Sequence, residues 1–441
     1  MWFRRPSKID ISQFTPIPAD GYLIGGAVRD LLLGREVSDI DWLVADAEAE
    51  ARATADLLGA AVFPLDENRG HWRVVLSEVT RDYIALQTEL EPNLAERDFT
   101  INAMAISSRG ELIDPMAGHK DLQQKTLRMV SEDNLRSDPL RLLRAVRIAC
   151  QIEFRIEPQT EQTIREVARD QLENRIGIPA WERVRQELDK IMLTERAGQG
   201  FQALAELGLL QVYLPELAAA KDVQQGGFHH LDVLGHSLEA LQQLVQGFAD
   251  ADLALRWATL LHDVAKPETK TYDGSRHYYH FYGHDKRGAE LTRHILLRLR
   301  HSTELADYAA KLVRYHMLQL PRDDKAARRF AHRRRDILPD LLKLMIADRE
   351  AARGPLSSPA SRQAYRLALA RVLSIMEESP TPVALLSGHE VMQLLNLAPG
   401  PRVGKALRFL AEAQAVADVA SLDEAKEALL QFAKGQGWQD A

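Results

Sequence analysis

Short apolar runs separated by polar and turn-forming residues mark the first 130 residues of the chain. Between residues 21 and 130 these runs are "GYLIGG", "DIDWLVAD", "WRVVLSEV", "DYIALQ", "AMAISS" and "GELIDP". Apolar runs of this length, bounded by glycine, proline or aspartate, are typical of β-strands. They alternate with stretches whose spacing favours helices. The pattern therefore predicts a mixed α/β head over residues 1–130.

From about residue 131 onward, the apolar positions recur at helical spacing. "DPLRLLRAVRIACQIEF" predicts a helix that carries Arg141, Arg144 and Arg147 along one face. "AGQGFQALAELGLLQVYLPEL" predicts a helix that ends near Gly208, followed by a short segment that stops at Pro215. We therefore expect an all-α remainder in three parts: a neck and body over residues 131–220, a histidine-rich domain over 221–355 and a helical tail over 356–441.

Composition narrows the class of protein. A chain of 441 residues is expected to form roughly two to four domains. It has no long apolar run and no signal-peptide pattern, so we expect neither a membrane span nor a membrane partner. The single cysteine, Cys150, excludes an intramolecular disulfide and a cysteine-based zinc site, and it fits a cytoplasmic location. The net charge of −7 is only weak evidence against nucleic-acid binding, because a local basic surface can attract phosphate.

Paired glycines and paired carboxylates lie close together near the N-terminus. Asp39 and Asp41 are two residues apart, so on a strand both would point to the same face. Crowded carboxylates repel unless a cation lies between them, and Mg²⁺ is commonly held by one or two carboxylates plus substrate phosphates. Gly25 and Gly26 would allow a backbone loop to approach a triphosphate closely. The segment predicts a nucleoside triphosphate site with Mg²⁺; the alternative is a turn and two surface acids.

Histidines and aspartates recur through the predicted helices after residue 220. Imidazole and carboxylate groups are good ligands for a divalent transition metal or Mg²⁺. We expect one metal to be held by His236, His262, Asp263 and Asp348. A second metal or a phosphate would be held by His284 and His316. The alternative is a helical bundle with surface histidines, and we assign no site role to His229, His230, His277, His280, His294 and His301.

A dense basic run, "DDKAARRFAHRRRD", lies at residues 323–336. Arginines in such a run can neutralise RNA phosphates, although charge runs more often form a solvated helix face. The residues that could contact RNA are Arg328, Arg329 and Arg333 in this run and Lys405 near the C-terminus.

Several motifs in order along the chain resemble known families. "LIGGAVRDLLLGREVSDIDWLVAD", "ERDFTINAMA", "LIDPMAGHKDL" and "SDPLRLLRAVRIACQIEFRI" resemble the class II nucleotidyltransferases, the family of bacterial tRNA CCA-adding enzymes and poly(A) polymerases. This resemblance spans roughly residues 21–190. "LLHDVAKP" is similar to the H-D-x-G-K signature of the HD phosphohydrolase superfamily, with Ala265 where glycine is common.

The resemblance implies a polymerase β-like head, and it implies roles for individual residues. Asp39 and Asp41 would be catalytic and hold Mg²⁺, while Gly25, Gly26 and Arg29 would contact the triphosphate of CTP or ATP. Arg97 and Asp98 would contact the nucleotide, and Asp138 and Arg141 would read the base edge, with Arg144 and Arg147 beside them. The alternative for Asp138 and Arg141 is a helix-terminal acid and a surface ion pair. The implied polynucleotide partner is tRNA, and the implied HD activity is that of a phosphatase or phosphodiesterase.

Three departures from the family pattern leave the product open. Glu96 replaces an expected arginine, and Ser137 replaces an expected glutamate. Only "QTELEPNLA" separates "RDYIAL" from "ERDF", which resembles CC-adding members that leave the last A to a separate A-adding enzyme. CC addition and full CCA addition both remain open, and Asp82 is either a third metal carboxylate or a surface acid. The rival functions are a poly(A) polymerase, a phosphohydrolase with a nucleotide-binding head, and a non-catalytic tRNA-binding protein.

Overall fold

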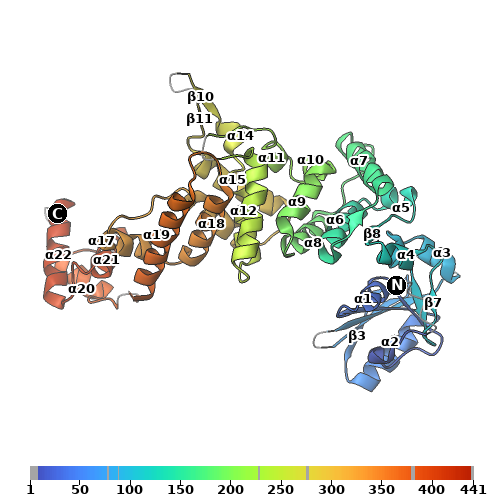
Figure 1. The fold of residues 1–441 in the computed structure, drawn as a ribbon. Coiled ribbons are helices and arrows are strands. Elements are labelled where there is room, and N and C mark those ends of the chain that lie inside the picture. Colours follow the sequence, from blue (N-terminus) through green and yellow to red (C-terminus); the bar gives the residue numbers. More distant parts are fainter. Residues whose placement is uncertain are drawn as a thin grey trace. The chain divides into compact units, whose positions relative to one another are not determined.

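A computed structural model describes residues 8–76, 79–87, 89–226, 229–274, 278–378 and 383–438. The chain divides into two compact units, Met1–Pro215 and Glu216–Ala441, and each is described here by itself (Figure 1). Among the described residues, no helix is long and apolar enough to cross a membrane.

A seven-stranded sheet with the order β3-β4-β5-β2-β1-β6-β7 forms the head. All neighbouring strands are antiparallel except β2 and β5. The predicted apolar runs supply six of the strands, and β3 is additional. The strands are β1 (Tyr22–Ile24), β2 (Asp39–Val44), β3 (Ala61–Asp66), β4 (His71–Val75), β5 (Thr80–Ala85), β6 (Ala105–Ser107) and β7 (Leu112–Ile113). Part of the predicted run "WRVVLSEV", residues 77–78, lies outside the described residues.

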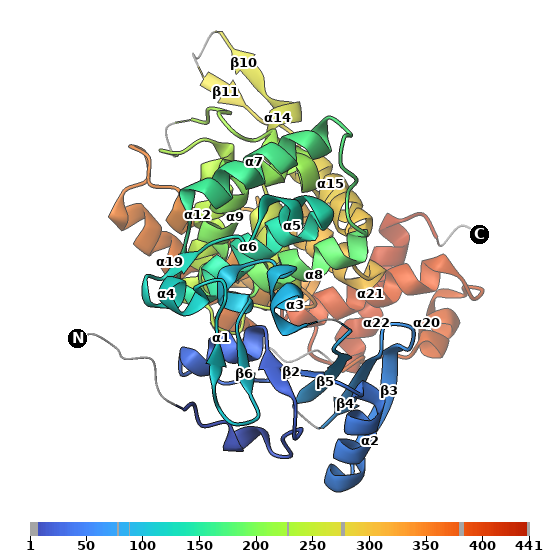
Figure 2. The same cartoon turned by 90° about the vertical axis from the view of Figure 1, so that its right-hand side faces the viewer.

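Helices cover both faces of the sheet because alternate residues of the central strands are buried on opposite sides. Helix α2 (Ala47–Leu58) packs on β4 and β5, where the buried Tyr83 hydroxyl lies 2.8 Å from Thr54 Oγ1 (Figure 2). On the other face, Leu43 packs with Leu94 of α3 (Leu90–Ala95). Asp39 and Asp41 share the face of Leu43. The sheet thus directs both carboxylates away from α2.

The rest of the first unit is helical, as the periodicity predicts. It contains α1 (Gly26–Leu32), α4 (Gly118–Gln123), α5 (Glu132–Ser137), α6 (Leu140–Ile152), α7 (Pro158–Leu172), α8 (Trp181–Met192), α9 (Ala197–Glu206) and α10 (Leu209–Tyr213), with a short parallel pair, β8 (Thr126–Leu127) and β9 (Arg155–Ile156). Helix α6 buries Leu142, Leu143 and Val146 and leaves its arginines on the opposite side. Gly208 adopts a φ of 80° between α9 and α10, which explains the predicted break.

The second unit is helical apart from one hairpin. Its helices are α11 (Pro215–Ala218), α12 (Val233–Gly247), α13 (Leu253–Leu261), α14 (Lys266–Thr269), α15 (His284–Arg298), α16 (Thr303–Tyr315), α17 (Asp324–Arg334), α18 (Leu338–Ala351), α19 (Pro359–Glu378), α20 (Gly388–Leu395), α21 (Pro401–Ala415) and α22 (Leu422–Gly435). Helices α12, α13, α16 and α18 pack around buried side chains that include Trp257, Leu312 and Leu341. The last three helices share a core around Val391, Leu410 and Leu429.

The all-α prediction for residues 131–441 is confirmed except at the short strand β9 and at one hairpin. Strands β10 (Thr271–Asp273) and β11 (Tyr278–His280) form an antiparallel hairpin. Its sequence, "TYDGSRHYYH", has an Asp-Gly pair flanked by tyrosines, which is a hairpin pattern. The hairpin matters because the residues that follow it lead directly into one of the sites described below.

Candidate active sites

The paired carboxylates lie at the start of β2, as predicted. Asp41 pairs in register with Asp82 of β5, so three carboxylates gather at this edge of the parallel strand pair. Thr80 Oγ1 donates a hydrogen bond to Asp39 Oδ1 at 2.9 Å. Asp82 accepts two hydrogen bonds from Arg73, both at 2.7 Å. Asp82 is therefore already paired with a cation, whereas Asp39 and Asp41 form the candidate metal-binding pair.

The pKa of Asp41 is raised to about 6. Burial is the main cause, and the negative charges of Asp82 and Asp39 add to it, while Arg97 acts in the opposite direction. A cation between Asp39 and Asp41 would relieve this repulsion. Since both groups are oxygen donors on one face of a strand, they fit Mg²⁺.

Gly25 brings the backbone close to this pair. Its φ of 71° and ψ of −136° are accessible mainly to glycine, and α1 begins at the next residue. A Cβ atom at Gly25 would lie 3.4 Å from both Asp41 Oδ2 and Arg97 Nη1. The loop therefore passes beside both a carboxylate and a guanidinium, and a methyl group at Gly25 would contact both.

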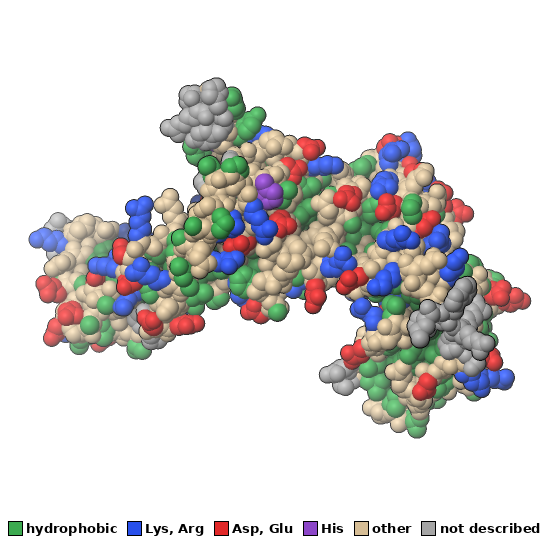
Figure 3. Space-filling view, viewed as in Figure 1, with side chains coloured by type: hydrophobic (Ala, Val, Ile, Leu, Met, Phe, Trp, Pro, Cys, Tyr) green, Lys and Arg blue, Asp and Glu red, His purple; other side chains and the backbone are tan. Residues whose placement is uncertain are grey.

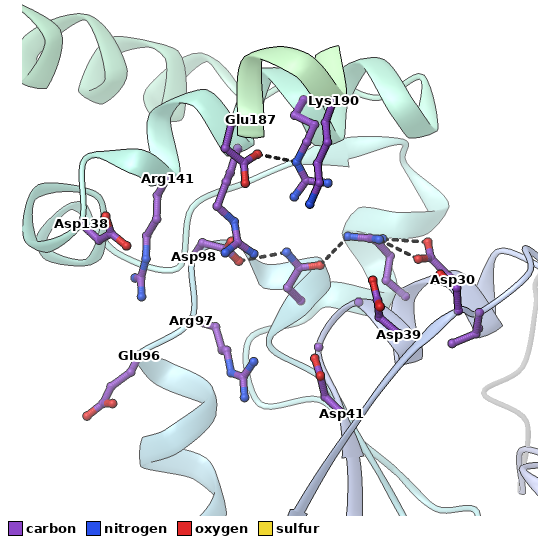
Figure 4. A pocket seen from close by; sticks show the side chains of 18 of the residues that line it. Asp30, Asp39, Asp41, Glu96, Arg97, Asp98, Asp138, Arg141, Glu187 and Lys190 are labelled. Carbon is purple, nitrogen blue, oxygen red and sulfur yellow. Dashed lines mark hydrogen bonds and ion pairs between the residues drawn. The ribbon is translucent and has the colours of Figure 1, made fainter. Parts of the chain in front are cut away.

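A chain of hydrogen bonds and ion pairs holds one wall of the head cavity (Figure 4). Arg29 donates to Asp30 and, at 2.9 Å, to Asn102 Oδ1. Asn102 Nδ2 donates to Asp98 Oδ1 at 2.9 Å, and Asp98 Oδ2 lies 3.0 Å from Arg144 Nη2. Asn102 was not singled out by the sequence analysis, although it lies within "ERDFTINAMA". This wall joins the glycine loop to α6.

Helix α8 supplies polar residues that the sequence analysis missed. Arg183 Nη2 donates to Asp138 Oδ2 at 2.8 Å, and Arg147 Nε donates to Glu187 Oε2 at 2.5 Å. The predicted base-reading Asp138 is thus already paired on one oxygen. The sequence feature that could have indicated these residues is the amphipathic pattern of "WERVRQELDKIM", whose polar face carries Arg183 and Glu187.

One cavity of about 520 Å³ brings the head residues together. In Figure 4, Asp39, Asp41 and Arg97 face a common space, and Glu96 also lines the cavity. Every predicted head residue lines this cavity: Gly25, Gly26, Arg29, Asp39, Asp41, Arg97, Asp98, Asp138, Arg141, Arg144 and Arg147. The cavity thus combines a metal-binding carboxylate pair with arginines suited to phosphate and base edges.

The second unit contains a buried histidine–aspartate cluster. His236 Nε2 lies 2.9 Å from Asp348 Oδ1, and His262 Nε2 lies 3.1 Å from Asp263 Oδ2. On the other side of Asp263, Oδ1 lies 3.5 Å from His284 Nε2 and 3.7 Å from His316 Nε2. Two potential metal-binding groups therefore share Asp263, one with His236 and His262 and one with His284 and His316.

The hydrogen bonds around this cluster suit metal ligands. The Nδ1 atoms of His262, His284 and His316 lie within 2.6–2.8 Å of backbone carbonyl oxygens, so each Nδ1 donates a proton and Nε2 is the atom that would bind a metal. Burial lowers the pKa of His236 and of His284, which favours neutral imidazole. Among the described residues, His262 Nε2 and Asp263 Oδ1 are buried without a hydrogen-bond partner. These donor atoms fit one or two divalent cations.

Two histidines that were assigned no site role lie at this cluster. His229 Nδ1 is 3.4 Å from His236 Nδ1, and both His229 and His280 line a cavity of about 750 Å³ that opens onto Asp263. The sequence could not reveal this because these side chains reach the site from a loop and from the hairpin. His301 instead packs against Trp257, and His277 lies outside the described residues.

The predicted RNA-contact residues lie in the second unit, and three of the four already have protein partners. Arg329 Nε and Arg333 Nη2 lie 2.9 Å and 2.8 Å from Glu412 Oε1, and Lys405 Nζ donates to Gln436 Oε1 at 2.6 Å. Arg328 lines a separate cavity with His332 and Arg335. RNA contact by these residues stays a prediction.

Three family models match the chain. The poly A polymerase head domain matches residues 21–65 and 72–128. The probable RNA- and SrmB-binding site of polymerase A matches residues 153–221, and the HD domain matches residues 233–353.

Curated relatives match over nearly the whole length. An A-adding tRNA nucleotidyltransferase from Deinococcus radiodurans is 52% identical over 435 residues, covering 98% of this chain and 99% of the relative. A CC-adding tRNA nucleotidyltransferase from Thermus thermophilus is 42% identical, covering 95% of each chain. The CCA-adding enzyme from Bacillus stearothermophilus, solved in complex with CTP, has the same fold, with a TM-score of 0.62 and 21% identity over 95% of this chain and 94% of that chain.

Proposed function

We propose a function on the premise that this chain belongs to the tRNA nucleotidyltransferase family: it transfers nucleoside monophosphates from CTP or ATP to the 3′ end of tRNA. The observation that carries the proposal is the pair Asp39 and Asp41 beside Gly25 in a cavity lined with arginines. No strand of nucleic acid is required as a template, because Asp138 and Arg141 offer an acceptor and a fork of donors to the base edge.

The residues of the cavity would divide the reaction between them. The 3′-terminal hydroxyl attacks the α-phosphorus, a new P–O bond forms, and the bond to pyrophosphate breaks. Mg²⁺ held by Asp39 and Asp41 would supply charge stabilisation at the reacting phosphate. Arg97 lies next to Asp41 and Gly25, where it can orient the triphosphate. Asn102 and Arg144 hold the Asp98 carboxylate in place, where it can accept from the ribose hydroxyl.

For the nucleotide, we propose AMP added to tRNA that ends in CC. The A-adding relative is 52% identical to this chain and the CC-adding relative 42%. Within the short segment before Arg97, residues Leu90–Ala95 form helix α3. The resemblance of this segment to CC-adding members leaves the product open. A separate CC-adding enzyme would then provide the substrate.

Sequencing of tRNA 3′ ends tests both the transfer of nucleotides to tRNA and the choice of AMP. Two transcripts, one lacking CCA and one ending in CC, are incubated with Mg²⁺ and with CTP, ATP or both. We expect one A on the CC-ended transcript and no addition to the shorter one. Addition of CC or CCA to the shorter transcript would contradict the AMP assignment while supporting the family activity. A long A tail would instead support the poly(A) polymerase alternative.

Variants of the carboxylate pair test the chemistry. Asp39→Ala and Asp41→Ala should each lower incorporation by at least about a thousandfold, because each removes a ligand for the charge-stabilising cation. Circular dichroism should be unchanged. Substantial incorporation by Asp41→Ala would refute the metal assignment.

A second activity is favoured by the histidine–aspartate cluster. We propose that it holds divalent cations and hydrolyses phosphate esters, with water attacking phosphorus and the ester oxygen leaving as an alcohol. Lys266 Nζ lies 2.6 Å from Asp263 Oδ2 and can also contact a phosphate. Metal analysis after incubation with Mn²⁺, Ni²⁺ or Mg²⁺ and desalting should find bound metal in the unsubstituted protein and little in His262→Ala/Asp263→Ala. Equal metal contents would contradict the site.

A further inference from the structure

Exposed aromatic side chains gather next to the histidine–aspartate cluster. Tyr282 is 79% exposed and Tyr272 54%, and the apolar Met317 and Leu356 are 58% and 61% exposed. Figure 3 shows hydrophobic side chains over the region of the hairpin. Tyr279, Tyr282, Met317 and Leu356 line the same 750 Å³ cavity as Asp263. A largely apolar cavity that also contains a few buried polar groups is typical of a binding site for a ligand with an apolar part.

Two rings in this group already form a stack. The His280 and Tyr282 rings are 4.8 Å apart between centroids, with an interplanar angle of 18°. His280 Nε2 lies 3.2 Å from Asp273 Oδ2, so the hairpin itself orients the imidazole. Tyr282 therefore lies flat on an oriented ring and keeps most of its surface in water. Such a surface can stack on a planar aromatic group, and nucleobases are planar aromatic groups.

The stack is a short distance from the candidate metal ligands. Tyr282 precedes His284 by two residues, so their Cα atoms are at most about 7.6 Å apart. His284 Nδ1 lies 2.7 Å from the carbonyl oxygen of Phe281, which fixes this connection. Tyr282 lines the same cavity as Asp263, so one nucleotide could place its base at the stack and its phosphate at the cluster. Lys266 lies on the same cavity wall, where its charge suits the phosphate.

We propose that His280 and Tyr282 form a stacking surface for the nucleobase of the phosphate esters on which the histidine–aspartate cluster acts. The proposal rests on the phosphohydrolase function proposed above. It assigns Tyr282 as a specificity-determining residue that holds the base while the phosphate lies at Asp263. A nucleotide at an RNA 3′ end and a free nucleotide share this chemistry.

Paired substrates test the assignment in the metal-loaded full-length protein. The probes are adenosine 3′-monophosphate, which has a base, and glycerol 2-phosphate, which has none. Tyr282→Ala should raise the ratio of the KM for adenosine 3′-monophosphate to the KM for glycerol 2-phosphate by about tenfold, since loss of one stacked aromatic weakens base binding by about that factor. Tyr282→Phe should keep the original ratio. Tyr272→Ala is a matched control, because Tyr272 is an exposed tyrosine of the same hairpin that is not among the residues lining the cavity.

Calorimetry of adenosine 3′-monophosphate binding provides a readout that does not depend on turnover. Tyr282→Ala should bind adenosine 3′-monophosphate more weakly than both the unsubstituted protein and Tyr272→Ala. The head is unchanged in all three proteins, so any binding there contributes equally. RNA ending in a 3′-phosphate, used as a second probe, distinguishes a polynucleotide end from a free nucleotide. If neither ester is hydrolysed, the phosphohydrolase function is refuted, and calorimetry alone decides the stacking proposal. An unchanged KM ratio together with unchanged binding in Tyr282→Ala would overturn the stacking proposal.

Discussion

At the residue scale, the head carboxylates lie close enough together to repel one another when no cation is bound. Asp41 is surrounded by Asp82 and Asp39, and its pKa is raised to about 6 from an ordinary value of 3.8. The neighbouring Asp82 is neutralised by Arg73, which limits the repulsion without removing it. An arrangement of this kind is costly without a cation and is stabilised when one binds.

The first prediction concerns the stability of the head. Because the pKa of Asp41 is higher in the folded chain than in the unfolded chain, its contribution to stability is fully present below about pH 4 and is lost as the pH rises through about 6. Asp41→Asn should therefore raise the free energy of unfolding at pH 8 by up to about 3 kcal/mol. Urea unfolding in EDTA measures this difference, and at pH 4.5 it should be much smaller.

Magnesium provides the control for this prediction. Mg²⁺ should stabilise the unsubstituted protein at pH 8 and have less effect on Asp41→Asn, since binding to the folded state alone raises stability. A stability gain for Asp41→Asn that is the same at both pH values would contradict the electrostatic explanation.

At the scale of elements, the loop between β1 and α1 and the turn after α2 both contain a glycine with positive φ. Gly25 lies against Asp41 and Arg97, with a φ of 71° and a ψ of −136°. Gly59 ends α2 with a φ of 63° and a ψ of 36°, and among the described residues nothing lies within 4 Å of a Cβ atom placed there. Alanine at either position would strain the backbone, but only alanine at Gly25 would also contact residues of the site. Comparing the two substitutions therefore distinguishes the two effects.

The second prediction uses this pair. Gly25→Ala should destabilise the protein by about 1–3 kcal/mol through backbone strain. It should also raise the KM for the nucleoside triphosphate severalfold, because the new methyl group lies where the backbone approaches the ligand. Gly59→Ala should destabilise by about 1 kcal/mol and leave that KM unchanged. Thermal unfolding and steady-state kinetics measure both quantities; equal KM values for the two variants would show that the loop does not contact the triphosphate.

At the scale of the whole molecule, each candidate site is complete within one compact unit. The residues that line the head cavity all lie between Gly25 and Lys190, and those of the histidine–aspartate cavity lie between Gln225 and Leu356. Neither site, as described, takes a residue from the other unit. The two chemistries should therefore be separable by substitution.

The third prediction is that substitutions in either site abolish the activity of that site and leave the other activity intact. His262→Ala/Asp263→Ala should abolish metal-dependent phosphate release and leave nucleotide incorporation within about twofold of the unsubstituted protein, because sites in different compact units that share no residues behave independently. Asp39→Ala/Asp41→Ala should abolish nucleotide incorporation and leave metal-dependent phosphate release within about twofold of the unsubstituted protein. Both activities are assayed on the same preparations. Loss of incorporation in the first variant would mean that the two sites are coupled.

The sequence by itself determined the local features of the protein. Short apolar runs located six strands of the head sheet, and helical periodicity located α6 and α9, since these patterns depend on residues that are near one another along the chain. The spacing of Asp39 and Asp41 placed both on one face of β2, and the arginines of α6 were placed on one face by the same kind of argument. Motif order indicated the family, which the relatives confirm.

Only the tertiary structure decided which distant residues share an environment. The pairing of Arg73 with Asp82 and of Arg183 with Asp138, and the approach of His229 to His236, depend on how elements pack. The hairpin itself has a local pattern and was overlooked, but the sequence could not show that His280 and the following Tyr282 line the same cavity as Asp263. Charge pairing, burial and raised pKa values arise from such three-dimensional neighbours, and so no pattern of nearby residues could have given them.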